Sequence, residues 1–211
     1  GTLLDFKNKT ISFFTTTSTG GGKKMSFADF EKYHLPVTSY DGKVITNMSD
    51  WVDMQHNAFN ELQNAIGSME LDESTLLYRG INMNALTCLV DGNGVNLGIN
   101  PNDSLETIFN KLQKLGVYVD NGLMSTSPVP TNITTSKDIV FKLECKKGVK
   151  GVDLNSVGGF ENEVLLAGGQ GFDITGYGTE IIEYESYEFI NNKSQKVMKK
   201  ALKNVIYLTA R

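Results

Sequence analysis

The feature that most limits the possible folds of this 211-residue chain is a change of hydrophobic period near residue 116. Before it, apolar residues recur three and four positions apart, as in 49–66, which is typical of helices. After it, apolar residues alternate with polar ones or form short runs between glycines, which is typical of strands. A helical first part followed by a β-rich second part predicts an α+β fold.

Capping residues set the expected bounds of the two clearest helices. The helix over 49–66 would begin with Ser49 as its N-cap, and the helix over 104–115 with Asp103 or Ser104. Apolar runs bounded by glycine, proline and asparagine define the strands. The predicted helices cover residues 26–33, 49–66 and 104–115, and the predicted strands cover residues 11–14, 76–80, 122–125, 139–145, 151–153, 162–166, 172–177, 179–190 and 203–208.

We expect a single domain over 1–211, with a mainly helical N-terminal part over 1–70 and a β-rich core over 71–211. The net charge of -4 argues against a nucleic-acid partner, which would need a basic surface. No apolar run approaches the roughly 20 residues that span a bilayer, so we expect no membrane insertion by this domain. The first residues lack the order of a signal peptide, which leaves open a larger parent protein.

The two cysteines, Cys88 and Cys145, are too few for a disulfide framework. Without nearby histidines they also do not make a zinc site. We expect both to be buried free thiols, and we expect no metal in the protein.

Two glycine-rich segments resemble nucleotide-binding motifs without meeting their requirements. The segment 16–24 lacks the first glycine of a P-loop and the Ser or Thr after its lysine. The segment 168–171 is followed by a predicted strand, whereas a dinucleotide fingerprint needs a helix whose N-terminus holds the pyrophosphate. Both segments are therefore predicted to be loops.

Three short motifs follow one another along the chain, each beside a predicted strand: Tyr78-Arg79-Gly80, Ser125-Thr126-Ser127 and Glu161-Asn162-Glu163. In this order they resemble the Arg / Ser-Thr-Ser / Glu-x-Glu class of mono-ADP-ribosyltransferases. That class includes clostridial binary toxins, Rho-modifying exoenzymes, vertebrate ecto-enzymes and phage enzymes. The resemblance implies a split β-sandwich of two mixed or antiparallel sheets with flanking helices, and NAD as the substrate.

The resemblance also implies roles for the first two motifs. Only Arg79 and Arg211 are arginines among the 20 basic residues, and the planar guanidinium of Arg79 could hold the NAD pyrophosphate through paired hydrogen bonds. The Gly80 backbone would approach the nicotinamide amide, and Tyr78 would line the pocket. The alternative for Arg79 is an arginine that forms a surface salt bridge.

The third motif would carry the chemistry. Cleavage of the nicotinamide bond gives the ribose an oxocarbenium character, which a carboxylate beneath the sugar stabilises. We assign this role to Glu163, with Ser125 orienting its carboxylate. In the class, the first acid faces the incoming substrate, so Glu161 would bind an acceptor arginine and help to deprotonate it.

Supporting roles fall to three more residues of these segments. Thr126 and Ser127 would support the NAD pocket. Phe160 would contribute to substrate recognition, although many relatives place that aromatic residue three positions before the first acid, where this chain has Gly158. The loop before the acid pair is therefore expected to have a different shape from that in relatives.

A second Glu-x-Glu, Glu183-Tyr184-Glu185, competes with the first. It lies in a predicted strand whose glutamates alternate with Ile182 and Tyr184, which indicates a solvent-exposed acidic face. The first pair runs into an apolar strand, glycines and another strand, which is the pattern of the class. We therefore favour Glu161 and Glu163.

The cation set departs from that of the toxins. The segment 128–136 lacks the arginine and phenylalanine that often clamp NAD, although Lys137 could supply a point charge. No second phosphate-binding arginine occurs in 1–78. These gaps predict weak NAD affinity, or help from another domain or a partner.

The sequence therefore predicts a transferase that moves ADP-ribose from NAD to a protein side chain, most simply arginine. The same pocket could instead serve an NAD glycohydrolase that uses water, or a binding module without chemistry. The expected partner is a host or target protein, and other domains of a larger toxin or virion protein are compatible with the chain. We expect a secreted or injected effector that acts in the cytoplasm of a target cell.

Overall fold

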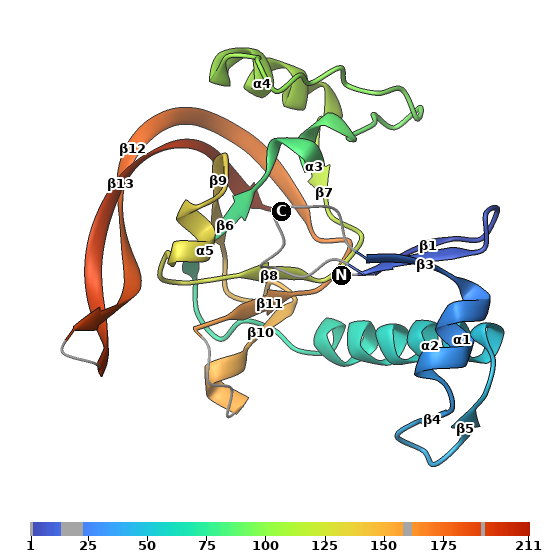
Figure 1. The fold of residues 1–211 in the computed structure, drawn as a ribbon. Coiled ribbons are helices and arrows are strands. Elements are labelled where there is room, and N and C mark those ends of the chain that lie inside the picture. The colour runs from blue at the N-terminus through green and yellow to red at the C-terminus, as the bar shows by residue number, and fades with distance from the viewer. Residues whose placement is uncertain (1, 14–22, 158–161, 191–192) are drawn as a thin grey trace. The chain divides into compact units, whose positions relative to one another are not determined.

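The computed structural model describes residues 2–13, 23–157, 162–190 and 193–211 of the chain. Its backbone contacts divide the chain into two compact units, residues 1–62 and 63–211. Each unit is described by itself, with the element labels of Figure 1.

The unit 1–62 combines short strands with two helices. Strands β1 (Thr2–Asp5), β2 (Thr10–Phe13) and β3 (Lys23–Ser26) form an antiparallel sheet, and β4 (Val37–Thr38) pairs with β5 (Val44–Ile45). Most of these strands were not predicted, because two to four residues are too few to show a period. Helix α1 (Phe27–His34) and the first part of α2 (Met48–Gly67) complete the unit. Its core buries Ile11, Phe30, Met48 and Val52.

The caps of these two helices test the sequence predictions. Ser26 caps α1 as expected, because its side chain accepts a hydrogen bond from the Asp29 backbone N–H. The prediction for α2 is wrong by two residues. Asn47 Oδ1 accepts a hydrogen bond from the Asp50 N–H at 2.9 Å, so the N-cap of α2 is Asn47 and not Ser49. Asparagine and serine cap equally well, so composition does not choose between them.

The unit 63–211 is built on two sheets. The larger has five strands in the order β6-β9-β13-β12-β7, and the smaller has three in the order β10-β11-β8. Within the larger sheet, β9 and β13 are parallel and the other pairs are antiparallel. The strands are β6 (Thr75–Ile81), β7 (Tyr118–Val119), β8 (Met124–Thr126), β9 (Ile139–Cys145), β10 (Gly151–Asp153), β11 (Val164–Leu166), β12 (Gly171–Ile190) and β13 (Lys193–Ala210).

The larger of two hydrophobic clusters in this unit joins its two sheets. Its fully buried members include Leu77, Phe141, Leu166 and Leu208, which come from both sheets. The α+β class with two mixed or antiparallel sheets and flanking helices is confirmed. No helix within the described residues has the length and apolar character needed to cross a membrane.

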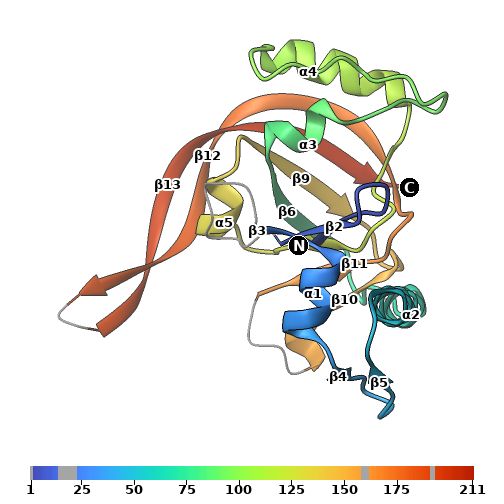
Figure 2. The same cartoon turned by 45° about the vertical axis from the view of Figure 1, so that its right-hand side comes forward.

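The last two strands are longer than predicted. β12 is one continuous strand, whereas the sequence predicted a break at Gly178, which here pairs with Val205 without interruption. β13 begins ten residues before the predicted strand 203–208. The added residues are mostly polar, and they stay in the strand because their backbones pair with β12 and their lysines meet its glutamates. Figures 1 and 2 show the two strands as a long hairpin.

The helices of this unit are short. They are α3 (Met83–Thr87), α4 (Leu105–Leu112), the 3-10 turn η1 (Gln113–Leu115), α5 (Asn132–Thr135) and the 3-10 turn η2 (Leu154–Val157). Helix α5 packs against both β6 and the hairpin strand β12. Both ribbon views show α5 between these two elements.

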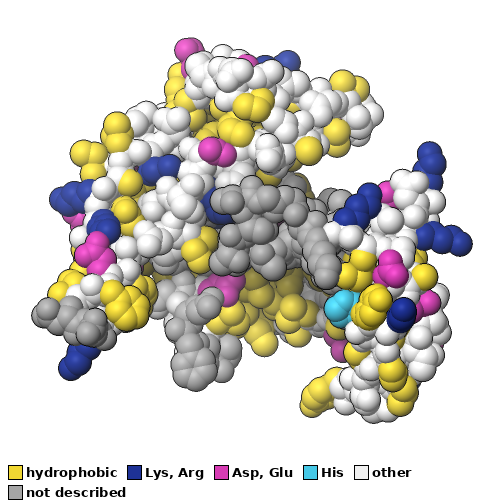
Figure 3. Space-filling model, in the orientation of Figure 1, with side chains coloured by type: hydrophobic (Ala, Val, Ile, Leu, Met, Phe, Trp, Pro, Cys, Tyr) yellow, Lys and Arg dark blue, Asp and Glu magenta, His cyan; other side chains and the backbone are white. Residues whose placement is uncertain are grey.

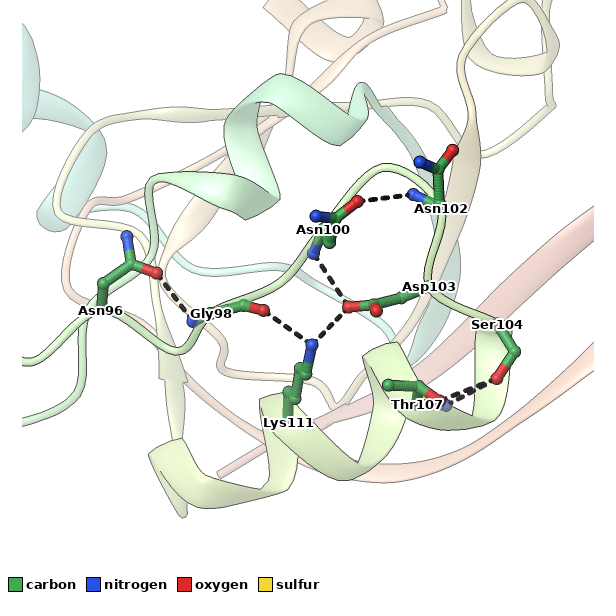
Figure 4. Close-up of polar contacts among 8 residues, drawn as sticks. All are labelled: Asn96, Gly98, Asn100, Asn102, Asp103, Ser104, Thr107 and Lys111. Atoms are coloured by element: carbon green, nitrogen blue, oxygen red, sulfur yellow. Dashed lines mark hydrogen bonds and ion pairs between the residues drawn. The ribbon is translucent and has the colours of Figure 1, made fainter.

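Helix α4 is capped by Ser104, one of the two predicted caps, whose hydroxyl accepts the Thr107 N–H (Figure 4). Lys111, in the last turn of α4, contacts the loop that precedes the helix. Its ammonium group donates to the Gly98 carbonyl at 2.6 Å and contacts the Asp103 carboxylate at 2.5 Å. This network ties the loop to the helix.

Candidate active site

A cleft of about 740 Å³ opens in the unit 63–211. The residues that line it come from β6, β8, α5, the loop before β11 and the β12–β13 hairpin. They include members of all three motifs. The lining residues are Tyr78, Arg79, Gly80, Leu123, Ser125, Thr126, Ser127, Thr131, Ile133, Thr134, Asn162, Glu163, Glu185, Tyr187 and Lys196.

The first two motifs are joined by backbone hydrogen bonds. Tyr78 N–H donates to the Ser127 carbonyl at 2.8 Å, and Ser127 N–H donates to the Tyr78 carbonyl at 2.9 Å. This bridge brings the end of β8 alongside the middle of β6. Arg79 is therefore held beside the Ser-Thr-Ser segment by main-chain geometry.

The third motif is held against the second by strand pairing and side chains. Thr126 pairs with Val164 in the β8–β11 ladder, and its hydroxyl donates to the Val164 carbonyl at 2.6 Å. The Ser127 hydroxyl lies 2.8 Å from the Asn162 carbonyl. These two hydroxyls are buried and donate their hydrogen bonds to backbone carbonyls. Thr126 and Ser127 therefore shape the cleft.

Glu163 lies immediately before β11, half-buried in the cleft wall. Its carboxylate accepts a hydrogen bond from the Ser125 hydroxyl. Its carbonyl accepts the Leu154 N–H at 2.9 Å, which anchors the backbone on the other side. The side chain is thus oriented by one hydroxyl and presented from a fixed backbone.

Arg79 is paired with an acid that the sequence did not point to. Its Nη2 lies 3.1 Å from Asp120 Oδ2, and each side chain keeps about a quarter of its surface exposed (25% and 26%). The Gly122 N–H holds the other Asp120 oxygen at 3.0 Å. Asp120 therefore holds one edge of the Arg79 guanidinium. The remaining N–H groups of Arg79 stay available to a ligand.

Gly80 is required by close packing. A Cβ atom at this position would lie 2.5 Å from both the Thr134 carbonyl oxygen and the Lys137 Cγ. Only glycine lets β6 approach α5 this closely. The same approach brings the 128–136 segment to the cleft.

Two predicted site residues, Glu161 and Phe160, lie outside the described residues. The roles assigned to them remain predictions. Asn162, between the two acids in the sequence, lines the cleft.

Sequence reasoning missed the contribution of the hairpin, from which Glu185, Tyr187 and Lys196 line the cleft. The face predicted to be exposed is not uniform, because the Glu185 side chain is only 17% exposed. Its backbone N–H donates to the Pro130 carbonyl at 2.9 Å. Lys196 was missed because 193–202 was not predicted as a strand, and Glu185 because its face of the strand was predicted to be exposed.

The cleft combines cationic, hydroxyl and carboxylate side chains. Arg79 and Lys196 can form ion pairs with phosphate groups, and Glu163 can stabilise a positive charge on a ribose. The volume of the cleft falls in the usual range of roughly 300–1,000 Å³ for ligand pockets. Among the described residues no group of three or more His, Cys, Asp and Glu side chains could hold a metal ion.

The family follows from a comparison of the whole sequence. The sequence model of the ADP-ribosyltransferase exoenzyme family matches residues 39–205, which is most of the chain. The protein belongs to this family, whose members transfer ADP-ribose from NAD. The predicted family is thereby confirmed.

Solved structures that resemble the chain include three bacterial proteins. The ADP-ribosylating toxin BECa of a Clostridium perfringens binary enterotoxin, solved with NADH, is 20% identical with a TM-score of 0.49, covering 81% of this chain and 38% of BECa. C3larvin from Paenibacillus larvae is 18% identical (TM-score 0.43; 88% and 80% covered). C3stau2 from S. aureus, solved with NAD, is 22% identical (TM-score 0.47; 76% and 72% covered). A search of curated protein sequences found no significant match.

Proposed function

We propose that this protein is an arginine-directed mono-ADP-ribosyltransferase. The observation that carries the proposal is the cleft in which Arg79, Ser125 and Glu163 meet, with the Glu163 carboxylate oriented by the Ser125 hydroxyl. The choice of arginine rests on the acid at position 161, the first of the Glu-x-Glu pair.

The residues divide the reaction between them. NAD supplies the ADP-ribosyl group, and its bond from ribose C1′ to nicotinamide breaks with the electron pair leaving on nicotinamide. Glu163 stabilises the positive charge that develops on the ribose. Glu161 receives the proton that the acceptor guanidinium loses as its nitrogen bonds to C1′. Arg79 holds the pyrophosphate and orients the ribose.

The same cleft would serve hydrolysis if water took the place of the acceptor. Because Glu161 and Glu163 have different roles, a substitution of Glu161 alone distinguishes transfer from hydrolysis. Glu161→Gln should lose protein labelling but keep much of the nicotinamide release, because its partner Glu163 still acts on the NAD bond. Incubating labelled NAD with a cell lysate and each variant measures both activities at once.

The linkage chemistry tests the acceptor independently. Label on arginine should be released by hydroxylamine and survive mercuric ion. Label with another stability, or equal loss of both activities in Glu161→Gln, would count against arginine. Nicotinamide release without any labelled protein would favour the glycohydrolase.

The setting of the enzyme is part of the proposal. We propose that it is a toxin-like effector, secreted or injected, that modifies a protein in the cytoplasm of a target cell. BECa and C3larvin are both described as toxins, and the chain spans 38% of BECa, which is compatible with further domains in a larger protein.

A further inference from the structure

The β12–β13 hairpin gives the cleft a charged wall that the motifs do not account for. Among the described residues that line the cleft, the cations are Arg79 and Lys196. Arg79 already shares its charge with Asp120. A pyrophosphate carries a negative charge on each phosphate, so a second cation is needed to balance it.

The loop that follows the Ser-Thr-Ser motif cannot supply that cation. Residues 128–136 contain no lysine or arginine, and Lys137, which the sequence offered as a point charge, does not line the cleft. The hairpin, however, is fastened to this loop. Glu185 N–H donates to the Pro130 carbonyl at 2.9 Å, and the Asn132 amide donates to the Ser186 hydroxyl at 3.0 Å. Lys196 is thus presented at the cleft beside the loop that lacks a charge.

The Lys196 side chain is placed to meet an anion. Its Nζ lies 2.8 Å from Glu185 Oε1, and the two side chains are 47% and 17% exposed, respectively. The hydrogen bond that Lys196 donates to the Glu185 carboxylate raises the pKa of Lys196, so the ammonium stays charged. An ammonium has three donors, and Glu185 takes one of them. Glu185 therefore holds Lys196 at the cleft and leaves two of its N–H groups for a ligand.

We propose that Lys196 binds the NAD pyrophosphate together with Arg79, in place of a second phosphate-binding arginine. The inference rests on the proposed function, since it assigns a residue to the same NAD site. The hairpin is in this view part of the substrate pocket.

Calorimetric titration of the full chain tests the assignment without relying on turnover. Lys196→Gln should raise the Kd for NAD by roughly 5- to 20-fold, because one charge-assisted hydrogen bond is lost at a site that water reaches. The Kd for ADP-ribose, which keeps the pyrophosphate and lacks nicotinamide, should rise by a similar factor. Lys196→Arg should restore most of the affinity for both.

Lys200 provides a matched control on the same strand. It forms the same kind of ion pair, with Glu183 at 2.8 Å, but does not line the cleft. Lys200→Gln should leave the Kd for NAD within about 2-fold of wild type, since distant surface charges are screened by salt. Thermal unfolding of each variant checks that the hairpin is intact.

The outcomes separate this inference from the proposed function. Equal weakening by Lys196→Gln and Lys200→Gln would overturn the assignment, and so would an unchanged Kd in Lys196→Gln while wild type binds NAD. A raised KM for a small guanidine acceptor with an unchanged Kd for NAD would assign the wall to the acceptor instead. A wild-type protein that bound no NAD would overturn the proposed function and this inference with it.

Discussion

At the residue scale, Glu163 has the most direct test. Glu163→Gln keeps the size of the side chain and its contact with Ser125 but removes the charge that would face the ribose. We expect transfer and NAD hydrolysis to fall by on the order of 100- to 1000-fold or more, with an unchanged melting curve. Labelled-NAD assays and thermal unfolding measure the two effects.

The control for this prediction comes from the competing acid pair. Glu183 is 61% exposed, pairs with Lys200 and does not line the cleft. Glu183→Gln should keep close to wild-type activity. If Glu183→Gln were the inactive variant, the placement of the acid pair would be wrong.

The cysteines are also distinguished by their surroundings. Both are free, but Cys88 is exposed, which corrects the expectation that both are buried. Burial raises the pKa of the Cys145 thiol to about 12. Because the thiolate is the reactive form, Cys145 should stay unreactive across the neutral range.

A chromogenic disulfide reagent at pH 8 should therefore titrate one thiol in the native protein and both thiols in denaturant. Cys88→Ser should abolish the native signal. Two fast thiols in the native state would show that β9 opens readily, since Cys145 is its last residue.

At the scale of elements, the contact between β6 and α5 sets the shape of the cleft. Gly80→Ala would place a methyl group 2.5 Å from the Thr134 carbonyl, so the helix must move away from the strand. We expect a loss of roughly 1–3 kcal/mol in the free energy of unfolding, typical of overpacking. The Kd for NAD should rise as well, because α5 carries part of the cleft lining.

Gly67→Ala is the comparison for this variant. A Cβ atom at Gly67, the last residue of α2, meets nothing within 4 Å. This change should be neutral or slightly stabilising, since alanine restricts the unfolded chain more than glycine does. Urea unfolding followed by circular dichroism compares the two variants, and equal destabilisation would argue against the packing account.

At the scale of the whole molecule, stability should follow the core that joins the two sheets of the unit 63–211. Leu208 on β13 is 1% exposed within it, whereas Leu202 on the same strand is 70% exposed. Leu208→Ala should cost about 2–5 kcal/mol in the free energy of unfolding because it leaves a cavity.

Leu202→Ala should change the free energy of unfolding by less than about 0.5 kcal/mol, as is usual for exposed positions. Figure 3 shows hydrophobic side chains beside basic and acidic ones over the hairpin, where this position lies. Urea unfolding measures both variants. Similar losses in the two would mean that the hairpin, and not the core, limits stability.

Local sequence was sufficient for much of the fold. Ser26 caps α1 as predicted, and Ser104 is one of the two caps predicted for α4, because a cap depends on residues within one turn. The strand over 139–145 was predicted with its observed bounds, since five of its seven residues are apolar and buried. The three motifs also predicted the family whose sequence model matches the chain.

The tertiary structure alone decided how those residues meet. The Tyr78–Ser127 bridge, the pairing of Arg79 with Asp120 and the entry of Lys196 into the cleft each join segments that are far apart in the chain. Such contacts depend on the register of strand pairing, and a local window of sequence contains no record of its partner strand. The mostly polar residues of 193–202 form a strand because their backbones pair with β12.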